Sequence, residues 1–147
     1  MKLISNAGNL FGLTDNDNKP EHIEQAINQG FDVKVDLWLQ DNQLYLGTYK
    51  PEYKLDIDWL EKHHHKLWLQ CHDLTIIDRF YDLDPMGTKL NYFFIDKDPI
   101  ARTSKWYNVI WGQKPIKGCV YINPELHSDF DFSQCYGLIS NSIAIYR

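Results

Sequence analysis

The sequence predicts a single α/β domain built on a small sheet or barrel that is poor in helix. Runs with the alternation of β-strands recur along the whole chain, whereas only three segments look helical. The 147 residues suffice for one sizeable hydrophobic core and leave no room for a second. Early strands are separated by helices and later strands only by short loops, so a helix cannot follow every strand. We therefore expect one compact, helix-poor α/β domain over residues 1–147.

The first fifty residues contain the clearest elements. A short strand is expected over residues 2–5. Residues 20–30 begin with a proline, carry apolar side chains at helical spacing and end with a glycine, which predicts a helix. Residues 31–40 alternate apolar with polar side chains, which predicts a strand with polar groups on one face. A tight turn at Asp41-Asn42 then returns the chain through residues 43–49 as a hairpin.

The remaining elements are shorter. A helix is expected over residues 56–63, with Asp56 as its N-cap, and another from Asp73 to Tyr81. Further strands are expected over residues 66–71, 89–95, 108–111, 119–123 and 135–140.

Composition and charge exclude several classes of protein. The chain has 15 Lys and Arg against 20 Asp and Glu, a net charge of −5, and no basic stripe interleaved with aromatic residues. Nucleic-acid binding is therefore not expected. No apolar run approaches the ~20 residues of a membrane-spanning helix, and the segment MKLISNAGNLFG lacks the apolar stretch of a secretory signal. We expect a protein of the cytoplasm or of a larger particle, neither secreted nor bound to a membrane.

The best-known local signatures of chemistry are missing. Three cysteines without CxxC spacing predict buried thiols in place of a disulfide framework or a zinc ribbon. The sequence also has no GxxxxGK[ST] phosphate loop, no GxGxxG after a strand, no HExxH and no GxSxG.

Four short motifs nevertheless follow one another in an order and spacing that can be compared with known families. They are Asn6-Ala7-Gly8, Pro20-Glu21-His22, Lys34-Val35-Asp36 and Gly47-Thr48-Tyr49. With the segments between them, they resemble the opening of glycerophosphodiester phosphodiesterases and other phospholipase-C-like phosphodiesterases. In that family the same frame reads His-Arg-Gly, Pro-Glu-Asn, Glu-x-Asp and Gly-His-Asp.

The rest of the chain resembles a shortened bacterial and phage branch of the same superfamily. The segments that carry this resemblance are Leu67–His72, Tyr92–Ile95, Thr103–Lys105, Trp111, Pro124-Glu125 and Gly137–Asn141. The resemblance implies a small, irregular TIM-like barrel of the phospholipase-C-like phosphodiesterase type. In such a barrel the site lies at the carboxyl ends of the strands.

The resemblance also implies a reaction that this chain is poorly equipped to perform. In that family, two histidines transfer protons and carboxylates hold a divalent cation. Here Asn6 and Thr48 stand in place of the two histidines, and Lys34 replaces a carboxylate next to Asp36. We therefore expect a vestigial site, with no catalytic residue, at Asn6, Ala7, Lys34, Asp36, Thr48, Gln70 and Asn141.

Lys34 stands where the phosphodiesterase family has a metal-binding glutamate, so the charge at this position is reversed. We expect its ammonium group to occupy the place of the metal and to pair with Asp36. No metal or cofactor is expected, and Mg²⁺ or Ca²⁺ would be required only by an unexpectedly active site.

Several side chains remain candidates for binding a ligand. They are Lys34, Asp36, His72 and Lys105, the last with the hydroxyl groups of Thr103 and Ser104. His72 either reaches the old pocket or belongs to a helix-capping loop. The other polar clusters are expected to be structural: a solvated turn at His63–His65, turn-forming Asp96 and Asp98, and an exposed His127.

Three functions from different classes remain open. The first is a catalytically degenerate phosphodiesterase-like protein kept as an interaction or structural subunit, for example of a virion or ribonucleoprotein particle. The second is a module that binds an anion or a small phosphoester through Lys34, Lys105 and Asn6. The third is an active phosphodiesterase with relocated catalytic groups, His72 and Asp36. The first is the function that we expect.

Overall fold

The strand β2 (Asp32–Gln40) organises the sheet because it pairs with three other strands. Its first residues pair in parallel with β1 (Lys2–Asn6), and its last four pair in antiparallel fashion with β3 (Gln43–Leu46). On its other edge, β5 (Leu67–Cys71) pairs in parallel over five residues. The expected strand and hairpin over residues 31–49 are thus present in the computed structural model, which describes residues 1–147.

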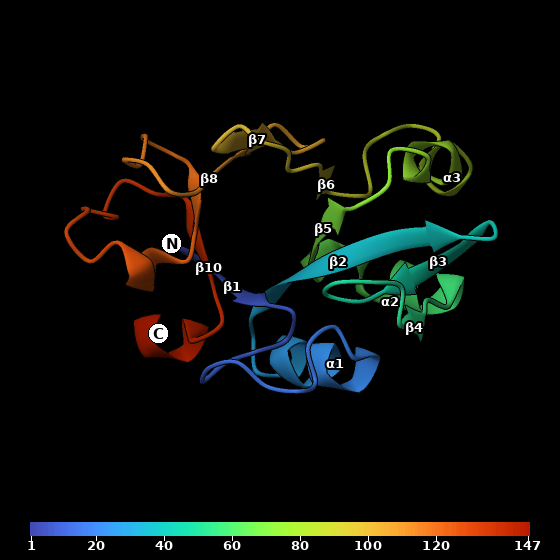
Figure 1. Ribbon diagram of the computed structural model, residues 1–147, viewed down its shortest axis with the longest axis horizontal. Coiled ribbons are helices and arrows are strands. Elements are labelled where there is room, and N and C mark those ends of the chain that lie inside the picture. Colours follow the sequence, from blue (N-terminus) through green and yellow to red (C-terminus); the bar gives the residue numbers. More distant parts are fainter.

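The remaining strands extend this centre in both directions (Figure 1). The order is β4-β3-β2-β1-β10-β9-β8-β7, while β6 pairs with the free edge of β5. These further strands are β4 (Tyr53–Lys54), β6 (Tyr92–Phe93), β7 (Ile100–Arg102), β8 (Asn108–Ile110), β9 (Val120–Ile122) and β10 (Gly137–Ser140).

The sheet is a curled half-barrel, and the expectation of a TIM-like barrel is wrong. Neighbouring strands run parallel from β6 through β5, β2, β1, β10 and β9 to β8, but β7 is antiparallel to β8. No strand pair joins β6 to β7, so the sheet does not close. A TIM barrel needs eight parallel strands that alternate with helices, and this chain has too few helices for that pattern. The fold is mixed α/β and poor in helix.

Three α-helices lie outside the curl, as Figure 1 shows: α1 (Pro20–Asn28), α2 (Ile57–His63) and α3 (Ile76–Leu83). The predicted N-cap of α2 is confirmed, because the side chain of Asp56 accepts a hydrogen bond from the Asp58 amide. Helix α3 begins later than predicted, since the Asp73 carboxylate binds the amide and hydroxyl of Thr75 and forms a turn instead. Three 3₁₀-helices complete the fold: His64–Lys66, Pro124–Leu126 and Ile143–Tyr146.

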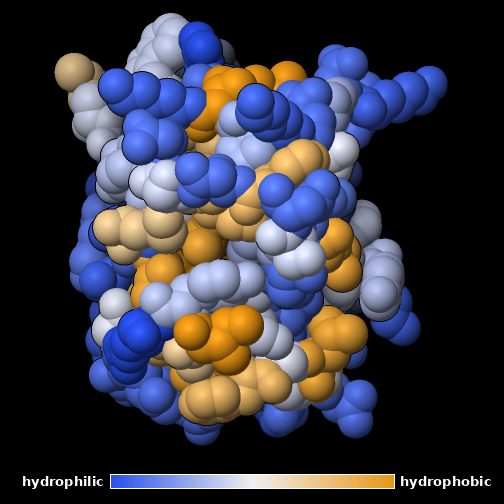
Figure 2. Space-filling model, turned by 90° about the vertical axis from the view of Figure 1, so that its left-hand side faces the viewer, coloured by the Kyte–Doolittle hydropathy of each residue, from blue (hydrophilic) through white to orange (hydrophobic).

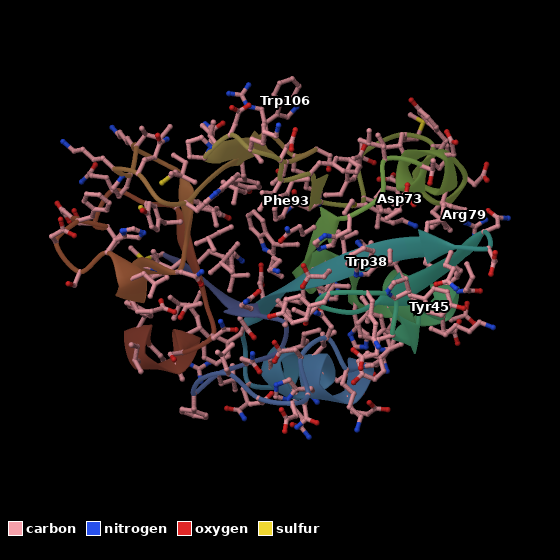
Figure 3. All side chains as sticks on the ribbon, viewed as in Figure 1. Trp38, Tyr45, Asp73, Arg79, Phe93 and Trp106 are labelled. Atoms are coloured by element: carbon pink, nitrogen blue, oxygen red, sulfur yellow. The ribbon has the colours of Figure 1, made fainter.

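Two apolar cores lie on opposite faces of the sheet. The larger core packs Val33, Val35 and Leu37 of β2 against the helices. The smaller core fills the inside of the curl, where Figure 3 shows the ring of Phe93. Its members are Ile4, Trp68, Phe93, Val109, Val120 and Ile139. Because side chains alternate along a strand, the charged residues of β2 also face this interior.

Other differences from the predicted elements have local causes. The strand expected over residues 89–95 shrinks to β6, because the carboxylate of Asp84 binds the amides of Lys89 and Leu90. Strands β4 and β7 have only two and three residues, too few for a recognisable alternation.

The three cysteines are free and buried. This confirms the predicted buried thiols, and the Sγ atoms of Cys119 and Cys135 lie 3.4 Å apart. Burial and the neighbouring Cys119 raise the pKa of Cys135 to about 12, which keeps it in the thiol form at neutral pH.

None of the helices has the length and apolar character that crossing a bilayer requires. On the side of the molecule shown in Figure 2, hydrophobic residues form separate patches among hydrophilic ones.

Candidate functional site at the carboxyl edge of the sheet

Asp36 is the centre of a polar cluster inside the curl. It lies on β2 and is only 5% exposed, yet its carboxylate has three side-chain partners. The partners are Lys34 from the same strand, His72 from the end of β5 and Asn18 from the loop before α1. We call these four residues the Asp36 cluster.

Lys34 neutralises Asp36 directly, as the sequence predicted. The two residues are separated by one position on a strand, so their side chains point to the same face. The Lys34 Nζ atom lies 3.1 Å from both Asp36 Oδ1 and Oδ2, and the Lys34 residue is only 6% exposed. The ammonium group therefore lies across both oxygens of the only carboxylate in the cluster.

Two opposing effects, burial and the interactions with neighbouring side chains, set the pKa of Asp36. Burial alone would raise this pKa, because it disfavours the charged carboxylate. The Lys34 ammonium and the hydrogen bonds from His72 and Asn18 outweigh burial and hold the pKa of Asp36 below its ordinary value. Asp36 is thus an anion, bound on several sides, at neutral pH.

His72 reaches the site, which decides between the two interpretations of this residue. Its Nε2 atom donates to Asp36 Oδ1 at 2.8 Å, and its side chain remains 24% exposed. The ring stacks on the indole of Trp38, with centroids 4.4 Å apart and planes 8° apart. Trp38 is itself fixed because its Nε1 donates to the carbonyl oxygen of Gly47. The imidazole is therefore held in one orientation beside the carboxylate.

Asn18 is completely buried in this cluster. It was not among the site residues predicted from the sequence. Its Nδ2 donates to Asp36 Oδ2 at 2.9 Å and to Thr48 Oγ1 at 3.0 Å, while its Oδ1 accepts from the Asp36 amide. Asn18 has a φ of 63°, in the left-handed region that asparagine tolerates better than most residues. An asparagine just before the Lys-Pro at the start of α1 was the one available signal.

A second polar network joins the ends of β1 and β10. Asn141 Oδ1 accepts from Asn6 Nδ2 at 3.0 Å and from Asn9 Nδ2 at 2.9 Å. His22 Nε2 lies 2.9 Å from Asn9 Oδ1, and burial lowers the pKa of His22 despite the nearby Asp17. Neither Asn9 nor His22 was among the predicted site residues.

Ala7 lies in the turn between these two networks. Its φ of 57° falls in the left-handed region, and its carbonyl accepts from the Asn18 amide. The Ala7 amide donates to the carbonyl of Lys34 at 2.8 Å. Ala7 therefore contributes its backbone to the site.

One residue of the expected vestigial site, Gln70, and one predicted binding residue, Lys105, do not join the cluster. Gln70 is aligned with Asp36 in the β2–β5 register, but its side chain makes no hydrogen bond to the cluster. Lys105 follows β7, and Arg102 at the end of β7 pairs with Asn108 at the start of β8. Because β8 runs parallel to β1 and β2 through the sheet, Lys105 lies at the amino edge, opposite Asn6 and Asp36.

The hydroxyl groups of Thr103 and Ser104 have structural partners. Thr103 Oγ1 accepts from the amides of Lys105 and Tyr107 and fixes the turn between β7 and β8. Ser104 Oγ donates to the carbonyl of Leu90 and accepts from the Tyr92 amide. These contacts leave no arrangement of Thr103, Ser104 and Lys105 around an anion.

The histidine tract differs from the expected solvated turn. His63 is buried, His64 is half-buried and His65 is exposed. His63 lies 3.5 Å from Glu24 and packs against Trp59, and burial lowers its pKa. His127 is half-buried against Phe130, whereas Asp96 and Asp98 are exposed as expected for turn residues. No group of three or more His, Cys, Asp or Glu side chains gathers in a way that could hold a metal ion.

Comparisons with protein-family models, with curated proteins and with solved structures found no match. The chemistry of the Asp36 cluster therefore rests on its own geometry. It offers one imidazole and one carboxylate, both already hydrogen-bonded to each other, and one ammonium group that is already paired. None of the five main cavities is lined by a residue from this cluster.

Proposed function

We propose that this protein is a catalytically inactive, phosphodiesterase-like domain that serves as an interaction or structural subunit. The observation that carries the proposal is the position of Lys34 Nζ, 3.1 Å from both oxygens of Asp36. A divalent cation at this carboxylate would have to displace the ammonium group and would then lie beside it, at a cost in Coulomb energy.

Proton transfer is also poorly supported. A reaction that needs both an acid and a base near neutral pH requires two titratable groups of suitable pKa. The Asp36 cluster has a single imidazole, and the pKa of its carboxylate is held low. The amide groups of Asn6 and Asn18 and the hydroxyl of Thr48 cannot act as proton shuttles near neutral pH.

The first test introduces a second carboxylate at the position of Lys34. The natural chain is expected to show no heat of binding for Mg²⁺ or Ca²⁺ and no hydrolysis of bis-p-nitrophenyl phosphate or of a glycerophosphodiester. Lys34→Glu is expected to bind Mg²⁺ or Ca²⁺ in a calorimetric titration, because it places two hard oxygen ligands side by side.

Lys34→Gln is the matched control, since it removes the ammonium group without adding a carboxylate. It is expected to bind neither ion measurably. Tight binding of either ion to the natural chain would overturn the proposal, because Lys34 would then not take the place of a cation.

The loops at the carboxyl edge also support an interaction role. Five exposed apolar side chains follow β1, β3, β5 and β9: Phe11, Leu13, Tyr49, Leu74 and Leu126, which are 81%, 78%, 91%, 71% and 71% exposed. Large apolar side chains at one edge are available there for contact with a protein partner.

Hydroxyl-radical footprinting tests this role on the chain in its native assembly and on the purified chain. Phe11, Tyr49 and Leu74 are expected to be protected in the assembly. Trp106 is the internal control, because it is 77% exposed and lies in the turn after β7, at the opposite edge. Figure 3 shows that it points away from the curl. Equal labelling of Phe11, Tyr49 and Leu74 in both samples would count against the interaction role.

One observation favours a second candidate function, a phosphodiesterase with relocated catalytic groups. The His72 imidazole is oriented by Trp38 and bonded to Asp36 at 2.8 Å, as a histidine held for proton transfer would be. Turnover of a glycerophosphodiester that His72→Ala abolishes would establish this function. Turnover that survives His72→Ala would exclude this residue as the catalytic group.

A further inference from the structure

The largest of the five main cavities lies at the amino edge of the sheet, opposite the Asp36 cluster. It has a volume of about 580 Å³, within the range of small-molecule sites. Its walls include Lys2 at the start of β1, Asp32 at the start of β2, Lys66 just before β5, Tyr136 just before β10, and Arg147.

Asp32 is the centre of the charges in this cavity. Its side chain is 7% exposed and accepts a hydrogen bond from Trp68 Nε1 at 3.1 Å. Lys2 Nζ lies 3.5 Å from Asp32 Oδ2, and Lys66 Nζ lies 3.5 Å from Asp32 Oδ1. A single buried carboxylate thus holds two ammonium groups, one on each oxygen.

The two ammonium groups have capacity for a further anion. Each has three donors, and the lysine side chains remain 38% and 33% exposed. The guanidinium of Arg147 adds a third positive charge, held over the ring of Phe31 at 4.2 Å. Asp32 is the only acidic side chain among the lining residues, so the side chains of the cavity carry an excess of two positive charges. This excess is local, because the whole chain has a net charge of −5.

An aromatic wall adjoins the charges. Tyr136 is 37% exposed, and its ring stacks on Tyr107, with centroids 4.8 Å apart. The hydrogen bond to Tyr136 and burial raise the pKa of Tyr107, and the nearby charges of Lys105 and Lys2 only partly oppose this rise, which places Lys105 on the same edge. The cavity therefore combines a positively charged end with a flat apolar surface.

We propose that this cavity binds a small-molecule phosphomonoester, with the phosphate at Lys2 and Lys66 and the organic part against Tyr136. A phosphomonoester carries close to two negative charges at neutral pH and three acceptor oxygens, which match two lysines and the local excess of charge. A single carboxylate ligand would leave one positive charge uncompensated. The proposal does not depend on the Asp36 cluster, which lies at the other edge of the sheet.

Calorimetric titration with phenyl phosphate tests the proposal, with inorganic phosphate and benzenesulfonate as comparison probes. Phenyl phosphate is expected to bind best, because it has both the double charge and the aromatic ring. Lys2→Gln and Lys66→Gln are each expected to weaken its binding at least about 10-fold. Lys54→Gln, which makes the same charge change at an exposed site on β4, is expected to change it less than about 2-fold.

Two further readouts keep the test decisive if a lysine variant does not fold. Tyr136→Leu leaves the charges intact and is expected to weaken phenyl phosphate but not inorganic phosphate. In NMR spectra of the natural chain, phenyl phosphate is expected to shift the indole N–H signal of Trp68, because that group is bonded to Asp32. No binding of phenyl phosphate at millimolar concentration, or equal binding by Lys66→Gln and Lys54→Gln, would overturn the proposal.

Discussion

Two aspartates on β2 show how single residues determine the polar interior of this sheet. Asp32 and Asp36 are both about 5% exposed, and both are compensated by lysines. An isolated carboxylate in the curl would be far too costly, because burial in a low-dielectric interior disfavours charge. The pairing with Lys34 is local, whereas Lys2 comes to Asp32 from β1 and Lys66 from the 3₁₀-helix before β5.

The pairing of Asp36 predicts a specific loss of stability in acid. The pKa of Asp36 is lowered in the folded state, so its contribution to the free energy of unfolding is complete above its unfolded value of about 3.9. This contribution is lost as the pH falls through the lower, folded value. Urea unfolding at pH 7 to pH 2 is expected to show a decline that starts near pH 4.

Asp36→Asn separates this effect from general acid sensitivity. At pH 7 it is expected to reduce the free energy of unfolding by about 3–5 kcal/mol, because it leaves Lys34 buried without its partner. Below pH 4 its further decline is expected to be smaller than that of the natural chain. Asp15→Asn, at an exposed position, serves as the control, and an identical acid decline in all three proteins would contradict the prediction.

At the scale of the elements, the end of the hairpin β2–β3 packs against the carboxyl edge of the sheet. Its end returns close to Asp36, since the Gly47 amide donates to the Asp36 carbonyl and the Gly47 carbonyl accepts from Trp38. The backbone of Lys50 crosses this glycine so closely that a Cβ atom would clash with the Lys50 carbonyl oxygen. Gly47 is thus required by close approach of the chain, with no positive φ involved.

Gly47→Ala is therefore expected to lower the free energy of unfolding by about 2–3 kcal/mol, since overpacking forces the backbone to move. The substitution is also expected to disturb the Trp38–His72 stack, which tryptophan fluorescence would report. Gly112→Ala provides the comparison, because its Cβ would meet no atom within 4 Å although its φ is 68°. Its cost is expected to be about 1 kcal/mol. Equal losses for both variants would show that close approach at Gly47 has no effect.

The predicted elements succeed where local pattern is strong and fail where it is short. Helix α1 and strand β2 lie within two residues of their expected bounds, because side-chain periodicity and terminal residues act within the segment. Strand β3 begins where expected but ends three residues early, at Leu46. Strand β6 is much shorter than expected, because Asp84 and Ser104 take the backbone groups that an extended strand would use.

At the scale of the whole molecule, the curl depends on the contact between its two ends. Strands β6 and β7 do not pair, yet Ser104 links them, since its amide donates to the Tyr92 carbonyl at 2.8 Å and its hydroxyl bonds to both Leu90 and Tyr92. The side chains of the inner core then fill the space between the ends. Ser104 thus connects the two ends of the open sheet by three hydrogen bonds, although the strands β6 and β7 do not pair.

Ser104→Ala is expected to lower the free energy of unfolding by about 2 kcal/mol, because it leaves a donor and an acceptor of the backbone without a partner. Amide exchange at Tyr92 is expected to become faster, while that at Ile4 in β1 remains unchanged. Ser128→Ala is the control at an exposed serine without a side-chain hydrogen bond. Unchanged exchange at Tyr92 would mean that the Ser104 hydroxyl does not help to hold the ends of the sheet together.

The sequence by itself determined the helix-poor α/β class, the alternation of β2 and the pairing of Lys34 with Asp36. These features depend on neighbours along one strand or helix, whose geometry is the same in any fold. Only the tertiary structure decided that the sheet remains open, that Asn18 and His72 meet at Asp36, and that Lys105 lies at the opposite edge. Those outcomes follow from strand order, register and the ends of short loops, which no local periodicity encodes.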